Sequence, residues 1–574
     1  MTLTFVTAYL KIYENNPGQR SENWRMQQFR NIAETGIQLC IYISPIFENE
    51  IVELIKEYPN VKIMKMVDIY DTWTGKIVQD CSLPDNRNLV KDTKEYILLQ
   101  NAKLEFVADA IKENPWNSTH FAWIDFSISY IFKNLKSCQQ QLIELSSARL
   151  SNNFLTIPGC WEKMDDYNNY YNNNINWRFC GGFFLGNKDR VQDFCDSYFQ
   201  HFPRFLKESE KLVWEVNLWA WMEHQQLLEA NWFSGNHDDS ILLVPEEFIY
   251  FGCSKIESVI SYPYPEIEYF QPTSTAYFCH EGQHWLNTRY VNYHITPRGG
   301  YLYLDGSNTI KNKNIVSELF LDTSQNLFPI TNNFRIMDET TVQLPELTPN
   351  SYSTGLEDIR LYSVNGNMRF IATNLNYSPV GTNRMVVGDY DPICGTYSNC
   401  SYVIPPNPES RCEKNWIPIV RQVENKDEKE KEKEKGEEEL FIYQWSPMEI
   451  GRIIDGHLVI IEKHETPFPW FNRFRGSTIF IPMDELTNKN KLIGVVHFSI
   501  EGSPRHYYHS LVVLDSISLK PLEYSAPFYF LNRGIEFCIG FTVQENNYVF
   551  WISQNDRDPV MITVDKNSIE FILQ

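Results

Sequence analysis

Apolar and polar positions follow two different patterns along the 574 residues, and the pattern changes near residue 290. Before that point, short apolar runs alternate with segments whose apolar residues recur at helical spacing. The expected strands are 4–10, 36–44, 61–67 and 120–128, and the expected helices are 21–36, 51–59 and 92–114. This alternation predicts an α/β, Rossmann-type domain with a mostly parallel sheet, helices on both faces, and ligands at the carboxyl ends of its strands.

After about residue 299 the helical spacing disappears, and short strands separated by turn residues take its place. Asn365-Gly366 is typical of a two-residue hairpin. The remaining 275 residues, divided by five, give 55 per unit, which fits a five-bladed β-propeller of four-stranded blades. A β-sandwich is the alternative. We therefore expect two domains, 1–292 and 299–574.

Composition narrows the class of protein. The chain has 51 basic and 73 acidic residues, a net charge of −22, and a duplex repels such a surface, so we expect no nucleic-acid partner. Aromatic residues make up 14% of the chain. A composition that is both acidic and rich in aromatic residues favours neutral or metal-bridged ligands, of which sugars are the commonest.

Other features favour a soluble, cytoplasmic protein. The first residues lack a basic leader, and no apolar run reaches the roughly 20 residues of a membrane span. The twelve cysteines show no CxxC spacing, which favours reduced thiols, although Cys394, Cys400 and Cys412 leave a zinc site as a minor alternative. The charged run 424–439 is interpreted as a solvated insertion at a hairpin tip rather than a partner-binding tail, and no protein partner can be inferred.

Candidate chemistry in the first domain begins with Asp125, which follows an apolar strand where a nucleotide diphosphate would lie. Transfer from a nucleotide sugar needs a divalent cation there, usually held by Asp-x-Asp, but Ser127 takes the second position. Further candidates follow in the sequence. They are the backbone-approach glycines Gly181 and Gly182, Glu215 among aromatics, the His237-Asp238-Asp239 run, and His284 in the HEGQH stretch. Each also has a structural interpretation, as a bulge, a salt bridge or a helix cap.

The motifs WIDFS, RFCGGFFLG, WEVNLW and NHDDSIL, in this order, resemble the HtrL/YibB family, a group allied to GT-A nucleotide-sugar glycosyltransferases. The resemblance covers roughly residues 1–290. It implies a UDP- or GDP-sugar donor, a glycan acceptor, and Mn²⁺ or Mg²⁺ held by Asp125 with His284, or its rival His237. By the same resemblance Thr7, Ala8 and Tyr9 hold the nucleotide base and Lys103 reaches the diphosphate. The base of an inverting reaction would be Glu215, Asp238 or Asp239.

In the second domain, Glu357, Asp358 and Arg360 lie just before a strand, and Trp416 offers an aromatic platform for a sugar ring. A propeller gathers the starts of its inner strands around a funnel, so distant acids can meet across a glycosidic bond. The structural alternative for the acid–arginine pair is a salt bridge that fixes a blade.

This half resembles the five-bladed propellers of β-mannoside phosphorylases and related mannosyltransferases, through GLEDIR, GVVHFS and YYHSLVVLD. The resemblance implies that Asp358 is a general acid and that Arg360 and His497 bind sugar or phosphate. We expect a metal-dependent glycosyltransferase fused to a second glycan-active unit. The alternatives are that the propeller only binds glycans, or that the whole chain is a non-enzymatic adhesion or scaffold protein.

Overall fold

The computed structural model describes residues 3–13, 19–78, 81–163, 173–322, 328–345, 352–424, 435–466, 470–483, 490–502 and 504–573. The chain divides into two compact units, Met1–Tyr250 and Phe251–Gln574. The boundary lies earlier than the predicted 292, because strands β8 (Phe251–Gly252) to β11 (Gln283–Val291) pair with strands of the second unit.

The first unit is built on a seven-stranded mixed sheet in the order β3-β2-β1-β4-β6-β5-β7. Its strands are β1 (Leu3–Tyr9), β2 (Gln38–Ile43), β3 (Val61–Met66), β4 (His120–Ile124), β5 (Leu155–Gly159), β6 (Phe183–Asn187) and β7 (Asn231–Ser234). Strand β6 runs antiparallel to both neighbours, and the other pairings are parallel. The predicted α/β class is confirmed, whereas the GT-A assignment stays a prediction.

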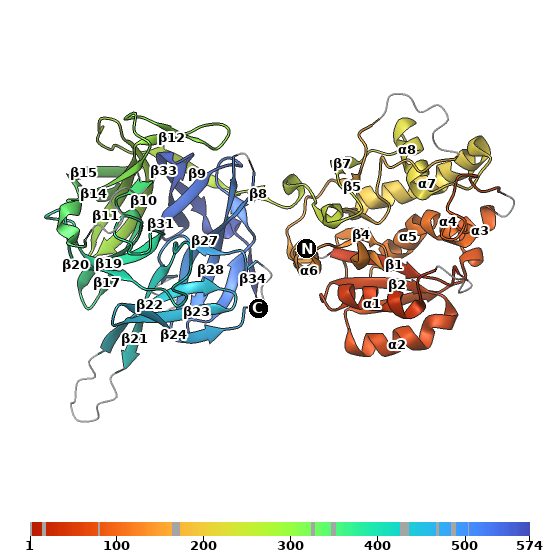
Figure 1. Cartoon of the computed structure of the whole chain (residues 1–574), viewed down its shortest axis with the longest axis horizontal. Helices are drawn as coiled ribbons and strands as arrows, with labels where there is room; N and C mark the ends of the chain where they lie inside the picture. The colour runs from red at the N-terminus through yellow and green to blue at the C-terminus, as the bar shows by residue number, and fades with distance from the viewer. Residues whose placement is uncertain are drawn as a thin grey trace. The chain divides into compact units, whose positions relative to one another are not determined.

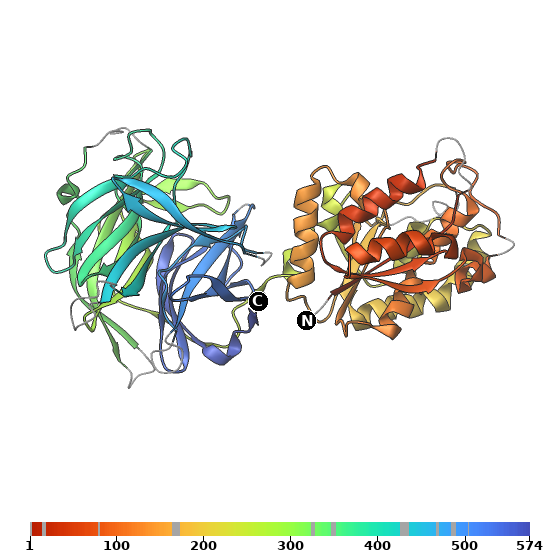
Figure 2. The same ribbon diagram turned by 90° about the horizontal axis from the view of Figure 1, so that it is seen from below.

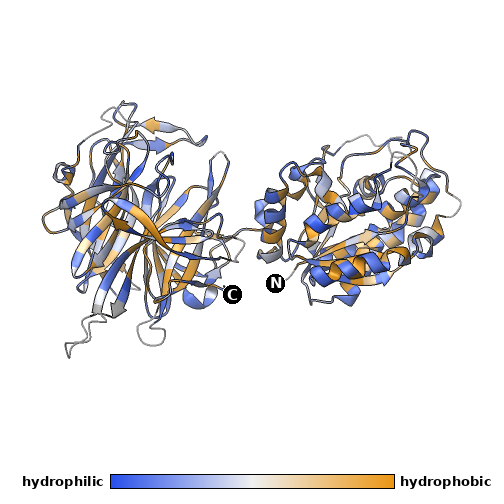
Figure 3. Ribbon diagram, turned by 60° about the horizontal axis from the view of Figure 1, so that its bottom comes forward, coloured by the Kyte–Doolittle hydropathy of each residue, from blue (hydrophilic) through white to orange (hydrophobic). Residues whose placement is uncertain are grey.

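Helices cover both faces of this sheet, with α1 on one side and α7 on the other (Figure 2). The helices are α1 (Glu22–Ala33), α2 (Glu48–Glu57), α3 (Trp73–Ile77), α4 (Lys94–Asn101), α5 (Lys103–Glu113), α6 (Leu135–Ser147), α7 (Lys188–Ser209) and α8 (Glu215–His224). The Ser21 side chain caps α1 by accepting from the Trp24 N–H, and Gly36 follows α1 with a left-handed φ of 76°. Apolar residues gather on the strands of the sheet, and the helices carry polar outer faces (Figure 3).

The helix predicted over 92–114 is two helices, α4 and α5, joined at Ala102. The Asn101 side chain donates to the Ile97 carbonyl at 2.9 Å and to the Val213 carbonyl at 2.7 Å, which holds this turn against another segment. None of the described helices is both long and apolar enough to span a bilayer.

The second unit is a propeller-like arrangement of antiparallel sheets (Figure 1). Four sheets have a main path of four strands. These are β10 (Gln271–His280), β11, β14 (Ile310–Asp322) and β15 (Phe328–Ile336); β17 (Glu357–Val364), β18 (Asn367–Asn374), β19 (Arg384–Asp391) and β20 (Thr396–Val403); β21 (Ile417–Glu424), β22 (Lys435–Trp445), β23 (Met448–Ile454) and β24 (His457–His464); and β31 (Glu536–Val543), β32 (Asn547–Gln554), β33 (Arg557–Asp565) and β9 (Ile256–Ser261).

The remaining blade-sized segment departs from this regularity. It forms an eight-stranded sheet around β27 (Lys491–Ile500) and β28 (His506–Asp515). Its other strands are β25 (Arg475–Gly476), β26 (Ile481–Pro482), β29 (Pro521–Ser525), β30 (Phe528–Tyr529), β34 (Phe571–Leu573) and β8. The prediction of five equal blades is therefore corrected to four regular blades, because short strands share the edges of β27 and β28 where one long strand was expected.

Two local predictions in this unit concern the Asn365-Gly366 turn and the charged run 424–439. Asn365 and Gly366, with φ of 50° and 77°, form the tight turn between β17 and β18, which confirms the hairpin. The charged run 424–439 begins at the last residue of β21 and ends within β22, and its residues 425–434 lie outside the described residues. Its last acids are not free surface charges: Glu438 pairs with Arg421, and Glu439 pairs with Arg369 at 2.8 Å.

Candidate functional site

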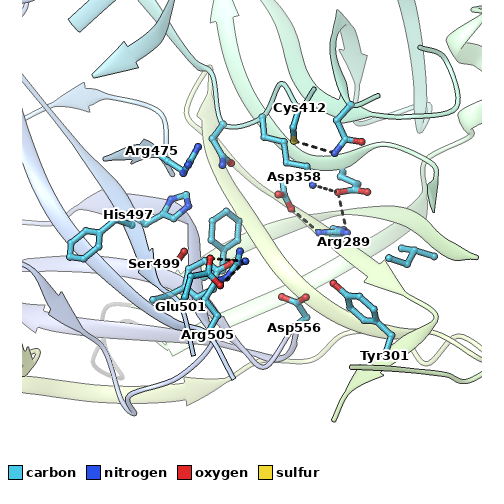
Figure 4. A pocket seen from close by; sticks show the side chains of 18 of the residues that line it. Arg289, Tyr301, Asp358, Cys412, Arg475, His497, Ser499, Glu501, Arg505 and Asp556 are labelled. Atoms are coloured by element: carbon cyan, nitrogen blue, oxygen red, sulfur yellow. Dashed lines mark hydrogen bonds and ion pairs between the residues drawn. The ribbon is translucent and has the colours of Figure 1, made fainter. Parts of the chain in front are cut away.

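The second unit contains a polar cavity of about 870 Å³ to which all five of its larger sheets contribute (Figure 4). Strands of four sheets line it directly, and the fifth sheet contributes the loop that precedes β21. The charged residues of its lining are Arg289, Glu357, Asp358, Lys414, Arg473, Arg475, Glu501, Arg505 and Asp556. Arginines and acids thus face one space, although the chain as a whole is strongly acidic.

Asp358 enters this cavity from an irregularity in β17. The pairing of β17 with β18 shifts register between Glu357 and Arg360, and Asp358 has a left-handed φ of 52°. Non-glycine residues adopt this conformation at an energetic cost, and bulges often redirect a side chain next to a site. Here the Asp358 carboxylate lies on the cavity wall, where it accepts from Arg289 Nη1 at 2.9 Å.

Arg289 of β11 is held in place within a cluster of acidic and basic side chains. Its Nε donates to Asn312 at 2.8 Å, and its Nη2 lies 3.6 Å from Glu357. Lys414 Nζ lies 3.3 Å from the same Glu357 carboxylate. Burial alone would raise the pKa of Glu357, but Lys414 and Arg289 outweigh it and lower the pKa to about 2. Glu357 therefore stays ionised and fixes the two cations.

Asp556, in the turn between β32 and β33, also lines the cavity and was not predicted from the sequence (Figure 4). It accepts from the Tyr293 hydroxyl at 2.8 Å. Burial raises the pKa of Asp556, with Asp358 and Glu357 adding to the rise and Arg289 opposing it. Tyr301, whose ring lies 4.6 Å from that of Tyr293, is 51% exposed at the cavity. The cavity thus combines a carboxyl group whose pKa is raised with an accessible aromatic face.

His497 and three arginines, Arg473, Arg475 and Arg505, also belong to the polar part of the lining. Burial lowers the pKa of His497 well below its usual range, so the ring is neutral, and its Nδ1 lies 3.0 Å from the Ser477 hydroxyl. Arg475 extends into the cavity beside it (Figure 4). Arg505 pairs with Glu501 at 3.0 Å.

Two of the predicted sugar-binding residues lie outside this cavity. Arg360 is 1% exposed and donates to the backbone carbonyls of Ser477, Gly476 and Asp358. It therefore has a structural role through backbone carbonyls, whereas Asp358 forms its ion pair with Arg289. Trp416 is also 1% exposed and donates to Glu413 at 2.9 Å, so its ring faces no ligand space. Glu357 and His497 do line the cavity.

The first unit has a smaller cavity, of about 340 Å³, at the carboxyl ends of β1 and β4. The chain leaves β1 toward β2 and β3 on one side and later places β4 on the other, so the cavity lies at a topological switch point. Four cations line it, Lys11, Arg20, Arg25 and Lys91, against the acids Glu22 and Asp125. Ligands of α/β sheets bind at this position.

Three predicted residues of the first unit meet in a buried cluster next to Asp125. Lys103 is 1% exposed, and its ammonium contacts Glu215 at 2.8 Å, the Gly181 carbonyl at 2.7 Å and Asp125 at 3.0 Å. Burial alone would lower the pKa of Lys103, but Asp125 and Glu215 outweigh it and raise the pKa. With three acceptors for its three protons, Lys103 is not available to a diphosphate as predicted.

The glycine pair makes room for this cluster rather than for a ligand. A Cβ atom on Gly181 would lie 1.9 Å from Glu215 Oε1, and one on Gly182 would lie 3.3 Å from the Ile241 side chain. Glycine at position 181 is therefore required by the buried carboxylate. The predicted role of the pair in ligand approach is not supported by this packing.

The side chains around Asp125 fit a manganese or magnesium ion poorly. One carboxylate oxygen, Oδ1, already accepts from the Trp123 indole at 2.7 Å and contacts Lys103 at 3.0 Å. Hard divalent cations prefer several oxygen ligands, and Ser127 replaces the second carboxylate. Mn²⁺ or Mg²⁺ at Asp125 stays a prediction.

The remaining predicted acids and histidines serve other roles. Asp238 accepts from Ser240 as a cap and pairs with Lys133, which lowers the pKa of Asp238 to about 2. Asp239 accepts from the backbone N–H groups of Lys133 and Asn134. His284 belongs to β11 of the second unit, where its Nδ1 lies 2.8 Å from the Tyr277 hydroxyl, so the reason for placing it with Asp125 is removed.

The predicted base-binding segment is mostly closed. Thr7 is fully buried in β1, and its hydroxyl has no hydrogen-bond partner among the described residues. Ala8 and Tyr9 line the cavity, but the Tyr9 ring is stacked between Phe47 at 4.1 Å and Phe126 at 4.2 Å. Tyr9 is therefore a wall rather than a free stacking surface.

Comparison with known proteins finds similarity in two parts of the chain. Residues 50–210, less than a third of the chain, match the family model HtrL_YibB, described as a bacterial protein of unknown function. This confirms the resemblance to that family over the matched residues. No curated protein matches the sequence.

Solved structures resemble the propeller-like part of the chain. A mannose phosphorylase from Leishmania mexicana, in complex with phosphate, is 12% identical, with 55% of this chain and 92% of that chain covered and a TM-score of 0.33. A β-1,2-mannobiose phosphorylase from Listeria innocua is 12% identical, with 53% and 93% covered and a TM-score of 0.33. A glycosyl hydrolase from Bacteroides ovatus is 11% identical, with 56% and 96% covered and a TM-score of 0.34. These values are too low to transfer an activity.

Proposed function

We propose that the second unit is a glycan-active enzyme that breaks or forms a glycosidic bond in the 870 Å³ cavity. The observation that supports this most directly is Asp358, held in a left-handed bulge with its carboxylate on the cavity wall beside Arg289. A second carboxyl group, Asp556, lines the same space, and glycoside chemistry uses two carboxyl groups on either side of the scissile bond.

The two carboxyl groups differ in environment, and this suggests different roles. Burial raises the pKa of Asp556, so it holds a proton more readily and suits protonation of the leaving oxygen. Asp358 is paired with Arg289 and suits the stabilisation of positive charge that develops on the sugar ring. The role of general acid predicted for Asp358 competes with this assignment. Tyr301 provides the exposed aromatic face against which a sugar ring can pack.

The arginines of the cavity favour an anionic acceptor. Arg473, Arg475 and Arg505 give the cavity a concentration of guanidinium groups, which suit an oxyanion such as phosphate. We therefore propose transfer of a glycosyl group to phosphate, with hydrolysis as the competing outcome. The assay separates the two, because phosphorolysis yields a sugar 1-phosphate and hydrolysis yields the free sugar.

The test is turnover of β-linked oligosaccharides by the full chain with and without inorganic phosphate, comparing Asp358→Asn and Asp556→Asn. Each variant should lose about 10²–10⁴-fold in activity. An aryl glycoside whose leaving group needs no proton should restore activity only to the variant that lacks the general acid. Asp455→Asn is the matched control, because Asp455 has a similar φ of 49° in a hairpin turn away from the cavity lining. Undiminished activity of both cavity variants would contradict the assignment of these two carboxyl groups. No turnover by the unmodified chain would leave a glycan-binding module or a scaffold.

A second function is favoured by the cavity at the switch point of the first unit. We propose that it binds the diphosphate of a nucleotide sugar, because four cations line it at the carboxyl ends of two parallel strands. A thermal-shift panel of nucleotide sugars, with and without Mn²⁺, tests this directly. Arg25→Ala should abolish the shift, whereas Arg204→Ala on the outer face of α7 should preserve it. No shift with any nucleotide sugar would contradict the proposal.

A further inference from the structure

Three loops of the first unit bring two thiols and an imidazole together at one edge of the sheet. Cys160 directly follows β5, Cys180 precedes β6, and His237 follows β7. Strand β5 pairs with β6 antiparallel and with β7 parallel, so the end of β5, the start of β6 and the end of β7 meet there. The three residues are far apart in the sequence, and the sheet topology juxtaposes them.

The ligand atoms of these residues are close enough to share one ion. The two Sγ atoms lie 3.5 Å apart, and the three possible ligand atoms all lie within 4.8 Å of one another. A tetrahedral ion with metal–sulfur distances of about 2.3 Å places two sulfurs about 3.8 Å apart. A disulfide, in contrast, needs a separation of about 2.05 Å.

The backbone of the three loops is tied together independently of any ion. The Cys180 N–H donates to the Pro158 carbonyl at 2.7 Å, and the Gly235 N–H donates to the Gly159 carbonyl at 3.0 Å. The Trp177 ring packs edge-on against the His237 ring, with centroids 4.4 Å apart. The side chains are thus presented from a fixed frame, which lowers the cost of ordering them around a ligand.

We propose that Cys160, Cys180 and His237 form a binding site for a soft divalent cation of the zinc class. Thiolate and imidazole ligands select such ions over magnesium or calcium. On binding, two sulfur–metal bonds and one nitrogen–metal bond form, and the two thiol protons pass to the solvent. Among the residues that the structure describes, this is the one group of three such side chains; the cysteines at 394, 400 and 412, the alternative suggested by the sequence, do not form one.

The site has a buried and an exposed side. Cys180 is fully buried, whereas His237 lies at the surface with Asn236, whose Oδ1 is 3.6 Å from Cys160 Sγ. Three protein ligands leave the fourth position of a tetrahedral ion to Asn236 or to water. An ion held in this way exchanges with solvent more readily than one enclosed by four protein ligands.

The test uses the reduced, chelator-treated full chain titrated with Co²⁺ and then with Zn²⁺. We expect one equivalent of Co²⁺ to produce the thiolate charge-transfer band and the strong visible bands of a tetrahedral site, and Zn²⁺ to displace it. Cys160→Ser and His237→Ala should each weaken Zn²⁺ binding at least about 100-fold. Because His237 is exposed, its variant keeps the fold even if Cys180→Ser does not.

Matched controls separate this site from unspecific binding. Cys81→Ser removes a half-buried thiol of the same unit, and His224→Ala removes an exposed histidine at the end of α8. Both should bind the ion as the unmodified chain does. Three results would overturn the proposal: no charge-transfer band at one equivalent, equal losses in the control variants, or a Cys160–Cys180 disulfide that persists after reduction.

Discussion

Each unit holds a cluster of cations and carboxylates, but the two clusters differ in whether their charged groups are accessible to a ligand. In the first unit, the Lys103 ammonium is buried and its three contacts are Glu215, Asp125 and the Gly181 carbonyl. In the second unit, Arg289 and Lys414 surround Glu357 and Asp358 on the wall of a large cavity. The first cluster is satisfied internally, and the second faces solvent.

This difference explains why similar residue types have different roles. A buried cation with three matched acceptors stabilises the fold but offers nothing to a substrate. A cluster at a cavity wall can exchange water for a sugar hydroxyl or a phosphate oxygen without leaving a charge unpaired. The four predictions that follow test this contrast.

The largest effect is expected from Lys103→Met. Removing the ammonium leaves the carboxylates of Glu215 and Asp125 without their cation, one of them in a buried position. Breaking such a pair costs about 3–5 kcal/mol of unfolding free energy. Denaturant unfolding, followed by signals of the first unit, measures this loss.

Lys56→Met is the control for that substitution. Lys56 also pairs with a glutamate, Glu53, but both side chains are more than 60% exposed. Exposed pairs contribute at most about 1 kcal/mol. A similar loss for both variants would show that burial of Lys103 is not what makes its cluster important.

Arg289→Met should cost less, about 1–3 kcal/mol. Lys414 still pairs with Glu357, and solvent in the cavity can hydrate Asp358. Glycan turnover should fall strongly even where the variant remains folded, because Asp358 loses the guanidinium group that orients it. Arg557→Met, at an exposed turn, is the control. A loss of stability as large as that of Lys103→Met would contradict the description of this cluster as open.

His509 is a buried titratable group without an ion partner, and it tests how burial alone affects stability. It is fully buried in β28, and neither ring nitrogen has a hydrogen-bond partner among the described residues. Burial lowers the pKa of His509 to about 3. The unfolded chain therefore binds its proton below pH 6.5 while the folded chain does not, so stability falls as pH drops from about 6.5 toward 3.

His509→Phe should stabilise the second unit by about 1–2 kcal/mol at neutral pH, because it removes two unsatisfied nitrogens. The gain should grow by about 2 kcal/mol between pH 6.5 and 5. Urea unfolding at the two pH values measures both terms. His457→Phe, at an exposed turn, should leave the pH dependence unchanged.

Trp416→Phe is expected to have the smallest effect, because it should leave the affinity for glycans unchanged. The indole donates to Glu413 and faces no cavity, so affinity should not change, while stability falls by about 1 kcal/mol. Tyr301→Ala should weaken binding up to about 10-fold, because its exposed ring borders the cavity. Calorimetric titration with oligosaccharides compares the affinities of the two variants. A larger loss of affinity in Trp416→Phe than in Tyr301→Ala would support the predicted role of Trp416 as a platform for a sugar ring.

The sequence predicted elements better than sites. Helical spacing and turn residues identified the α/β unit and the strand-rich unit, because these patterns are local. The domain boundary was predicted too late in the chain, because β9 and β10 lie in a region that the sequence pattern assigned to the first unit. Pairing of β9 with β33, some 300 residues later, leaves no local signal.

The sequence singled out cavity residues where the chemistry is unusual for the position and missed them where it is ordinary. Asp358 stood out beside Glu357 and Arg360, but whether an arginine faces a cavity or a core depends on bulge geometry that only the pairing reveals. Asp556 lies in an Asn-Asp hairpin turn, which by itself is typical of any β-protein. Its place in the cavity lining becomes evident only because other blades converge there.

The pairing of β9 with β33 also bears on how the chain is made. A ribosome releases β9 when the α/β unit is already complete, but β33 follows only after some 300 further residues. The first unit can therefore fold during synthesis, while the last blade of the second unit must wait for nearly the whole chain. During that interval β9 is a strand without its partner, and a nascent chain stalled before residue 557 should depend on chaperones in a way that the released protein does not.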